Sequence, residues 1–122
     1  MNDDAFFWAG VDEGRLLAQR CRDCGELRHP PVPKCPACRS VQWIAETLSG
    51  RGRIAAWIVS KHPTLPDTSA RTVILVELQE GLRLVSNLVD APKDCEIGTP
   101  VEAVFRDVGG VRLPQFRPEG ER

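Results

Sequence analysis

Short runs of apolar residues, separated by glycine, proline or aspartate, fill the second half of the chain and predict strands. The runs are RGRIAAWIVS, TVILVELQ, LRLVSNLV, VEAVFRDV and RLPQFRP. The segment LQEGLRL predicts a hairpin with its turn at Glu80 and Gly81. Five strands in about 70 residues, with no helix among them, predict a small closed or partly closed barrel. An SH3-like barrel or a small sandwich fits the pattern less well.

The apolar side chains of these runs are expected to form the core of the barrel. The residues expected there are Ile54, Trp57, Val59, Val73, Leu75, Val85, Leu88 and Val104. The longest polar connection, HPTLPDTSA, joins the first two runs. We therefore expect a mostly β protein whose largest unit is the barrel over residues 46–118.

A short helix is expected over residues 4–13, DAFFWAGVDE. Asp3 or Asp4 is placed to cap its N-terminus, where acidic residues also suit the helix dipole. Phe7 and Val11 are four positions apart and therefore share one face. Gly14 stands where a helix commonly stops.

Three adjacent aromatic residues, Phe6, Phe7 and Trp8, lie on this short helix. Consecutive helical residues point about 100° apart, so one surface cannot bury all three. Two interpretations remain open. The rings are either buried within the chain or form part of a surface for a partner protein.

The segment between the helix and the barrel contains two strand-like stretches, LLAQRC and VQWIAETL, and a proline-rich loop between them. The loop, RHPPVPKCPAC, has four prolines, which excludes a regular helix there. Four of the five cysteines of the chain belong to this segment and form the pattern C-x2-C-x10-C-x2-C.

This cysteine pattern strongly predicts a zinc site formed by Cys21, Cys24, Cys35 and Cys38. Each C-x-x-C turn directs two thiolates to one point, and two turns supply a tetrahedron. Four thiolates close the coordination shell, so the zinc is expected to be structural rather than catalytic. Iron in a four-cysteine redox site is the competing interpretation. Disulfides are the least favoured one, because paired cysteines in a reducing cytosol more often bind metal.

Composition adds limits on localisation and partners. The net charge is −1, so no global basic field favours nucleic acid. The chain has neither a run of about 20 apolar residues nor a recognisable secretory signal, so we expect a cytoplasmic protein without a membrane partner. The charge is uneven: residues 15–61 carry nine basic and three acidic side chains. This asymmetry suits a small anionic ligand better than a long polyanion.

No catalytic constellation is visible in the sequence. His29 and His62 are expected to be loop residues, because neither has a nucleophile or an acid placed beside it by spacing. Cys95 lies between Asp94 and Glu96, which should raise its thiol pKa, so we expect it to be inert. The chain is not expected to be an enzyme by itself.

The order of these parts resembles a known family. The matching features are FFWAGVDEGRLLAQRC leading into CRDCG, then PP and CPAC, then GRGRIAAWIVSKH, VELQEGLRLVSNL and IGTPVEAVF. They resemble the acyl-CoA-associated zinc-ribbon and OB-fold family, also called domain of unknown function 35. The resemblance implies an N-terminal helix (1–14), a rubredoxin-like zinc ribbon (15–45), a five-stranded OB-fold barrel (46–118) and a short tail (119–122).

The resemblance also implies a function. Members of the family accompany thiolase-fold enzymes: acyltransferases, thiolases and lipid-transfer-protein-like aldolases that shorten steroid side chains. Related domains occur with hot-dog-fold enoyl-CoA hydratases. We therefore expect a non-catalytic accessory subunit, associated with acyl-CoA, of a thiolase-like enzyme in lipid, steroid or polyketide metabolism. A heterotetramer with that enzyme is one expected form.

Acyl-CoA carries phosphates that arginine binds well. We expect the phosphate contacts at Arg51 and Arg53, with Arg28 and Lys61 behind them. Solvated surface charges are the alternative interpretation of these four residues. A different function, a single-stranded nucleic-acid-binding zinc-ribbon and OB protein, is also possible for this pair of modules. The acidic segment 62–122 and its few aromatic residues make that alternative weaker.

Overall fold

The computed structural model describes residues 4–60, 71–90 and 96–119 and consists mainly of strands. It contains one short helix and eight strands in the described residues. They are α1 (Ala5–Asp12), β1 (Leu17–Cys21), β2 (Leu27–Arg28), β3 (Trp43–Thr47), β4 (Arg51–Ser60), β5 (Arg71–Leu78), β6 (Arg83–Leu88), β7 (Pro100–Val108) and β8 (Val111–Pro118). The mostly β fold with a short N-terminal helix is therefore confirmed.

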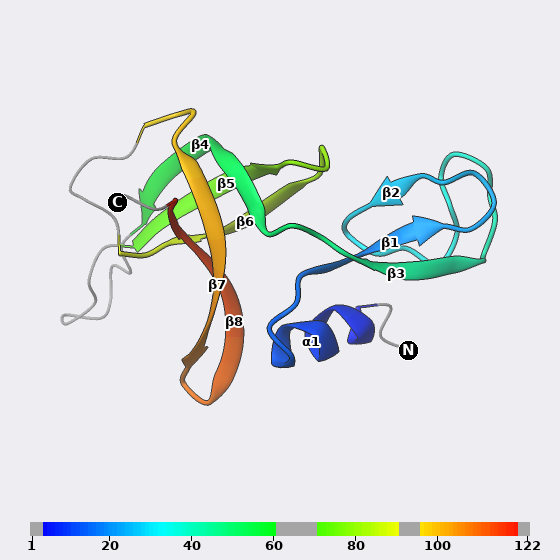
Figure 1. Cartoon of the computed structure of the whole chain (residues 1–122), viewed down its shortest axis with the longest axis horizontal. Coiled ribbons are helices and arrows are strands. Elements are labelled where there is room, and N and C mark those ends of the chain that lie inside the picture. The colour runs from blue at the N-terminus through cyan, green and yellow to red at the C-terminus, as the bar shows by residue number, and fades with distance from the viewer. Residues whose placement is uncertain (1–3, 61–70, 91–95, 120–122) are drawn as a thin grey trace.

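The strands form two separate sheets, which lie side by side in Figure 1. The first three strands form a small antiparallel sheet in the order β2-β1-β3, and this sheet carries the cysteines. The other five close into a barrel in the order β4-β5-β6-β8-β7. The predicted small closed barrel is confirmed, and the sandwich alternative is wrong.

Hairpins and one parallel contact close the barrel. The turn between β5 and β6 contains Gly81, whose φ of +93° a side chain would strain. Strands β7 and β8 form a long hairpin, and β8 then runs parallel to β6 where Leu88 faces Phe116. A bulge between Ile54 and Ala56 shifts the register of β4 against β5.

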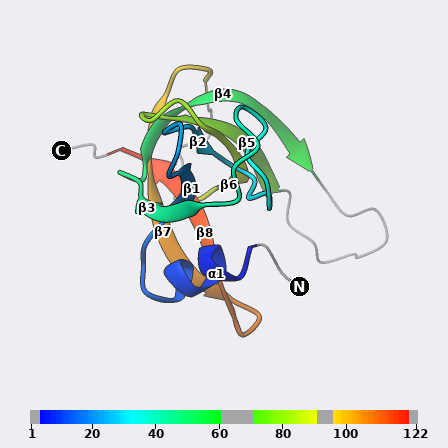
Figure 2. The same cartoon turned by 90° about the vertical axis from the view of Figure 1, so that its right-hand side faces the viewer.

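Helix α1 packs against both sheets, next to β1 and β8 (Figures 1 and 2). Its buried residues include Phe7 and Val11, as their spacing predicted. Gly10 is buried as well, and a larger residue would not fit there because its Cβ would lie 2.6 Å from the Leu17 side chain. Gly14 has a φ of +76° just beyond the end of the helix, which confirms the predicted stop.

The expected capping of α1 by Asp4 is wrong. Asp4 occupies the N-cap position but makes no side-chain capping hydrogen bond. Its carboxylate instead accepts a hydrogen bond from the Trp8 indole N–H, at 3.2 Å. The polar tip of Trp8 thus competes with the helix end for the same oxygen. The other candidate cap, Asp3, lies outside the described residues.

One apolar core joins the helix, the ribbon and the barrel. The buried residues of this cluster are Phe7, Val11, Leu16, Ala18, Leu48, Ile54, Ile74, Val76, Leu78, Leu88, Val101 and Phe116. The first five come from the helix, the connection after it, β1 and the connection before β4, and the others come from the barrel. The helix and the ribbon therefore complete the core of the barrel at one end.

The core prediction for the barrel strands is only partly correct. Ile54 and Leu88 are buried as expected. Trp57, Val59 and Val85 are wrong, because all three are exposed. Trp57 pairs with Ile74 across the β4–β5 ladder and shares its side of the sheet, but Trp57 is 41% exposed whereas Ile74 is buried.

Several sequence expectations lie outside the described residues. They concern Lys61, His62, Cys95 and the connection 62–70. In the part of the chain that is described, no helix has the length and hydropathy needed to cross a bilayer.

Candidate functional site

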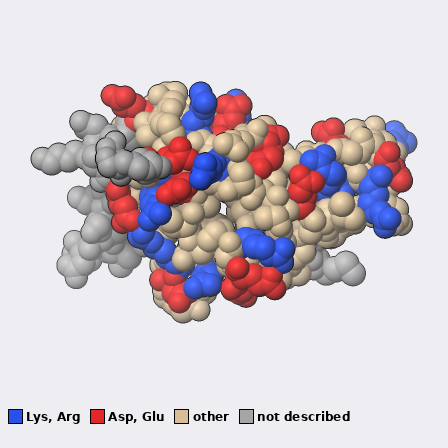
Figure 3. Space-filling model, in the orientation of Figure 1, with Lys and Arg blue, Asp and Glu red and all other residues tan. Residues whose placement is uncertain are grey.

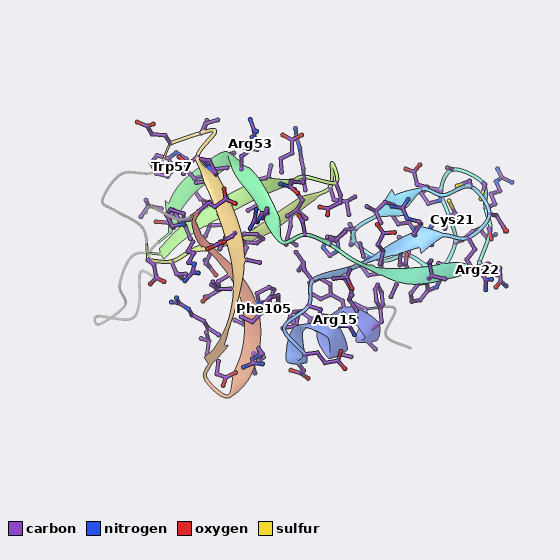
Figure 4. All side chains as sticks on the ribbon, viewed as in Figure 1. Arg15, Cys21, Arg22, Arg53, Trp57 and Phe105 are labelled. Atoms are coloured by element: carbon purple, nitrogen blue, oxygen red, sulfur yellow. The ribbon has the colours of Figure 1, made fainter. Side chains whose placement is uncertain are left out.

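The four cysteines of the ribbon meet at one point, at the end of the ribbon that lies away from the barrel (Figure 4). All four sulfur atoms lie within 4.8 Å of one another. The Sγ atoms of Cys21 and Cys38 are 3.5 Å apart, and those of Cys24 and Cys35 are 3.7 Å apart. The structure thus brings together the complete set of ligands that the spacing predicted.

Two similar turns present these sulfurs. In the first turn the Gly25 N–H donates to the Cys21 carbonyl, at 3.0 Å, and Gly25 has a φ of +81°. In the second turn the Arg39 N–H donates to the Cys35 carbonyl, at 2.7 Å, and Arg39 has a φ of +69°. Both turns therefore need a left-handed residue directly after their second cysteine, and only the first one uses glycine.

The geometry fits zinc. Zinc–sulfur bonds of about 2.3 Å in a tetrahedron place neighbouring sulfurs about 3.8 Å apart. The two measured sulfur–sulfur distances lie close to that value. Two ligands, Cys21 and Cys35, are buried, and the other two are exposed. A rubredoxin-like ribbon with four thiolates binds zinc as a structural ion, since no coordination position is left for a substrate.

Backbone N–H groups prepare the site for a metal. The N–H groups of Cys24 and, to a smaller extent, Asp23 donate to the Cys21 sulfur and lower the pKa of Cys21 to about 6. The thiolate is the form that ligates metal. These donors therefore stabilise the thiolate form of this ligand.

A buried polar network holds the loop between the cysteine pairs. The Arg28 Nε donates to the Gln19 Oε1 at 2.7 Å, and the Val32 N–H donates to the same oxygen at 3.0 Å. Arg28 is only 6% exposed, and one of its terminal nitrogens has no partner among the described residues. Its buried guanidinium belongs to the ribbon and does not line the hollow that contains Arg51 and Arg53.

Arg51 and Arg53 line a hollow of about 500 Å³ at the start of β4. Two carboxylates, those of Glu77 and Glu119, line the same hollow. The Arg51 Nε lies 3.6 Å from a Glu119 oxygen. The positive charge is thus partly neutralised within the chain. A role of these two arginines in phosphate binding stays a prediction, and Lys61 lies outside the described residues.

The three adjacent aromatic residues of α1 have three different environments. The Phe6 ring packs on Trp43 of the ribbon, with 4.6 Å between ring centroids. Phe7 is buried and lies 5.4 Å from the His29 ring. Trp8 is 40% exposed. Internal burial therefore accounts for Phe7, whereas Trp8 is free to contact another molecule.

A cleft of about 380 Å³ opens beside Trp8, where the helix, the ribbon and the barrel meet. Asp4, His29 and Ser86 all line it, and these residue types form hydrolytic triads elsewhere. Here the Asp4 carboxylate accepts from Trp8, and the Ser86 hydroxyl donates to the Pro114 carbonyl at 2.9 Å. Burial lowers the pKa of His29. The described residues contain no Ser–His or His–Asp hydrogen bond, so these three side chains are not connected as a triad.

Both sheets of the chain match known domain families. Residues 8–43 match the domain family described as the ChsH2 rubredoxin-like zinc ribbon domain. Residues 45–106 match the family described as the ChsH2 C-terminal OB-fold domain. The two matches cover the ribbon and most of the barrel. They are consistent with a metal at the four cysteines and identify the barrel as an OB fold.

Two curated relatives extend this similarity. A probable enoyl-CoA hydratase alpha subunit of Thermomonospora curvata is 44% identical over 95% of this chain. The chain spans only 37% of the length of that relative. A DUF35 domain-containing scaffold protein of Methanothermobacter thermautotrophicus is 39% identical over 87% of this chain and 77% of its own length.

The solved structure of an aldolase described as Ltp2-ChsH2(DUF35) contains a similar chain. The two chains superpose with a TM-score of 0.88 and are 43% identical. The match covers 97% of this chain and 96% of the other. The helix, the ribbon and the barrel thus recur together in a chain of nearly the same extent.

Proposed function

Because the chain belongs to the ChsH2-type family of zinc-ribbon and OB-fold proteins, also called domain of unknown function 35, we propose that it is a non-catalytic accessory subunit. Its partner is a thiolase-like enzyme, such as an aldolase, a thiolase or an acyltransferase. The substrate of the complex is an acyl-CoA of lipid or steroid metabolism. The partner supplies the catalytic residues, and this chain stabilises the partner.

One observation carries this proposal. The chain matches, almost from end to end, the ChsH2(DUF35)-like chain of a solved aldolase whose description also names Ltp2. The names of the curated relatives, a hydratase subunit and a scaffold protein, agree with a role in an assembly. The closed metal shell and the engaged polar groups of the cleft support a non-catalytic role.

Contact with acyl-CoA is a finer part of the proposal. We assign the phosphate contacts to Arg51 and Arg53, on the rim of the barrel, where both side chains are exposed. Glu77 and Glu119 share that hollow, so these arginines would bind phosphate only weakly in the isolated chain. We expect the affinity to be measurable only in the assembled complex, which we propose to be a heterotetramer.

The nucleic-acid alternative has less support. Single-strand binders present aromatic platforms on a basic surface. On the face drawn in Figure 3, acidic and basic side chains are mixed, and no continuous basic stripe crosses the barrel. Among the described residues, four arginines of the barrel form ion pairs, and two of them, Arg106 and Arg117, pair with Asp90 and Glu102.

Co-expression tests the proposal. The chain is produced together with a thiolase-fold enzyme from the same genome, and the pair is analysed by size-exclusion chromatography with light scattering. We expect a stable complex and an acyl-CoA activity that is lost when this chain is omitted. A partner that is stable and fully active alone, or a chain that never binds it, would refute the proposed function.

A further inference from the structure

Strand β5 is apolar on both of its faces. Val73, Ile74, Leu75 and Val76 are consecutive, and Ile74 and Val76 point into the barrel and are buried. Val73 and Leu75 alternate with them and point outward, where they are only half-buried. Strands with continuous apolar runs are typically covered on both faces. The described part of this chain covers one face only.

The strand register extends the uncovered side into a surface. Leu75 of β5 faces Ala56 of β4 and Val85 of β6, and these three residues form one row across the sheet. The next row is formed by Ile58, Val73 and Asn87. We call these six residues the outer face. Ile58 is 62% exposed and Val85 is 68% exposed, and a shallow apolar groove of about 160 Å³ runs between the strands.

A charged row borders the outer face. Arg53, Glu77 and Arg83 face one another across the same three strands, one row further toward the β5–β6 turn. Both arginines are exposed. The border therefore carries two positive charges and one negative charge. An apolar centre with a polar border is the usual anatomy of a protein–protein interface.

The outer face continues into the cleft beside the helix. Val85 lines both the apolar groove of the outer face and the cleft that contains Trp8. Trp8 is exposed, and tryptophan is enriched among the residues that contribute most to binding energy. A partner that covers Val85 can therefore reach Trp8 without leaving the surface, which brings the contact closer to the roughly 800 Å² that a stable interface takes from each protein.

We propose that the outer face, extended through Val85 to Trp8, is the surface on which the enzyme subunit docks. This inference rests on the proposed function and adds the location of the contact. The complementary surface of the enzyme is an uncharged apolar patch bordered by a carboxylate, which would pair with Arg83. A second copy of this chain fits less well, because it would bring the same net positive border to the contact.

Paired valine substitutions test the location. Val85→Lys places a charge where the outer face continues into the cleft beside Trp8, and Val85→Thr keeps the shape but adds a hydroxyl. Val111→Lys is the matched control, since Val111 is also an exposed strand valine, at 55%, but lies on β8 outside the outer face. The zinc-loaded chains are titrated by calorimetry against the thiolase-fold enzyme used in the co-expression experiment. Thermal unfolding and zinc content establish that each variant is folded.

We expect Val85→Lys to raise the Kd at least about 30-fold, the effect of losing one strongly contributing interface residue. Val85→Thr is expected to raise it about threefold to tenfold, and Val111→Lys to leave it unchanged. Ile58→Lys is a second variant on another strand and should behave like Val85→Lys.

The possible results separate the two proposals. If the wild type binds the enzyme and all three lysine variants (Val85→Lys, Ile58→Lys and Val111→Lys) bind it equally well, the docking surface is overturned. The accessory role is then left intact. Failure of the wild type to bind would overturn both. In a third outcome, the free chain dimerises, and Val85→Lys abolishes the dimer but not binding of the enzyme. This result would identify a second copy as the occupant of the surface and overturn the assignment to the enzyme.

Discussion

The ribbon and the barrel are stabilised by different means. In the ribbon, three short strands of five, two and five residues converge on four thiolates. In the barrel, buried aliphatic residues surround Phe116, which is fully buried. A sheet as small as the ribbon buries too little apolar surface to fold alone, so the metal replaces a core there. We therefore expect the stability of the ribbon to depend mainly on the bound metal and the stability of the barrel to depend mainly on the packing of its core.

The largest expected effect is the loss of the metal, which should unfold the ribbon and leave the barrel folded. Cys35→Ser removes a buried ligand, and structural zinc contributes an apparent ~10–16 kcal/mol to the folding of small zinc domains. We expect zinc binding to fail and the backbone amides of β1–β3 to lose their protection from hydrogen exchange, while the amides of β5 and β6 stay protected. Amide hydrogen exchange and zinc analysis of the purified chain measure both quantities.

Cys95→Ser is the control for this change, because it removes a cysteine that does not belong to the predicted ligand set. It should leave one zinc per chain. If the ribbon amides of the metal-free Cys35→Ser chain exchange as slowly as those of the wild type, the ribbon has a sufficient core and the comparison fails.

A smaller effect is expected from the packing of the barrel. Phe116→Ala leaves a cavity at a fully buried site, and such changes cost about 3–5 kcal/mol. Urea unfolding at saturating zinc should show this loss, with zinc content unchanged in the absence of urea. Phe105→Ala, at a half-buried neighbour of the same core, should cost less. A loss of zinc equal to that of Cys35→Ser would mean that the two regions fold as one unit.

The smallest expected effect is a pH dependence of stability that arises from His29, where the loop of the ribbon contacts the helix. Burial lowers the pKa of His29, whose ring lies against Phe7. The unfolded state then binds the proton more tightly, so this contribution to stability is complete above about pH 6.5 and declines as the pH falls below it. His29→Gln should remove that part of the decline.

The measurement is the Tm of both zinc-loaded proteins at pH 7.5 and pH 5.5. We expect the difference in Tm between wild type and His29→Gln to shrink at the lower pH. An equal difference at both values would show that His29 titrates alike in the folded and unfolded chains.

The metal site could be predicted from sequence because it depends on local spacing. Two C-x-x-C turns and a loop of ten residues suffice to predict the meeting of four sulfurs. The strands of the barrel were also predictable, since turn residues separate them. The two-residue strand β2 was missed because it is too short to show a pattern.

The faces of the barrel strands were not predictable for a physical reason. An alternating pattern identifies the inner face only when the other face is polar, and Val73 to Val76 are apolar throughout. The bulge between Ile54 and Ala56 also shifts the alternation of β4 at a place that the sequence does not mark. The burial of Arg28 was missed because it depends on Gln19, a partner on another strand.

The core that joins α1 to the barrel can form only after the whole chain has been synthesised, because its residues come from both ends of the chain. Phe7 leaves the ribosome about 110 residues before Phe116, which belongs to the same core. At a typical rate of about 5–20 residues per second, the apolar side of the helix waits roughly 5–20 s for the last strand. During this interval the complete cysteine set is already available, so the ribbon can take up its metal before the barrel exists. The nascent chain would then present a folded ribbon and an unburied helix, which is the form that a chaperone would meet.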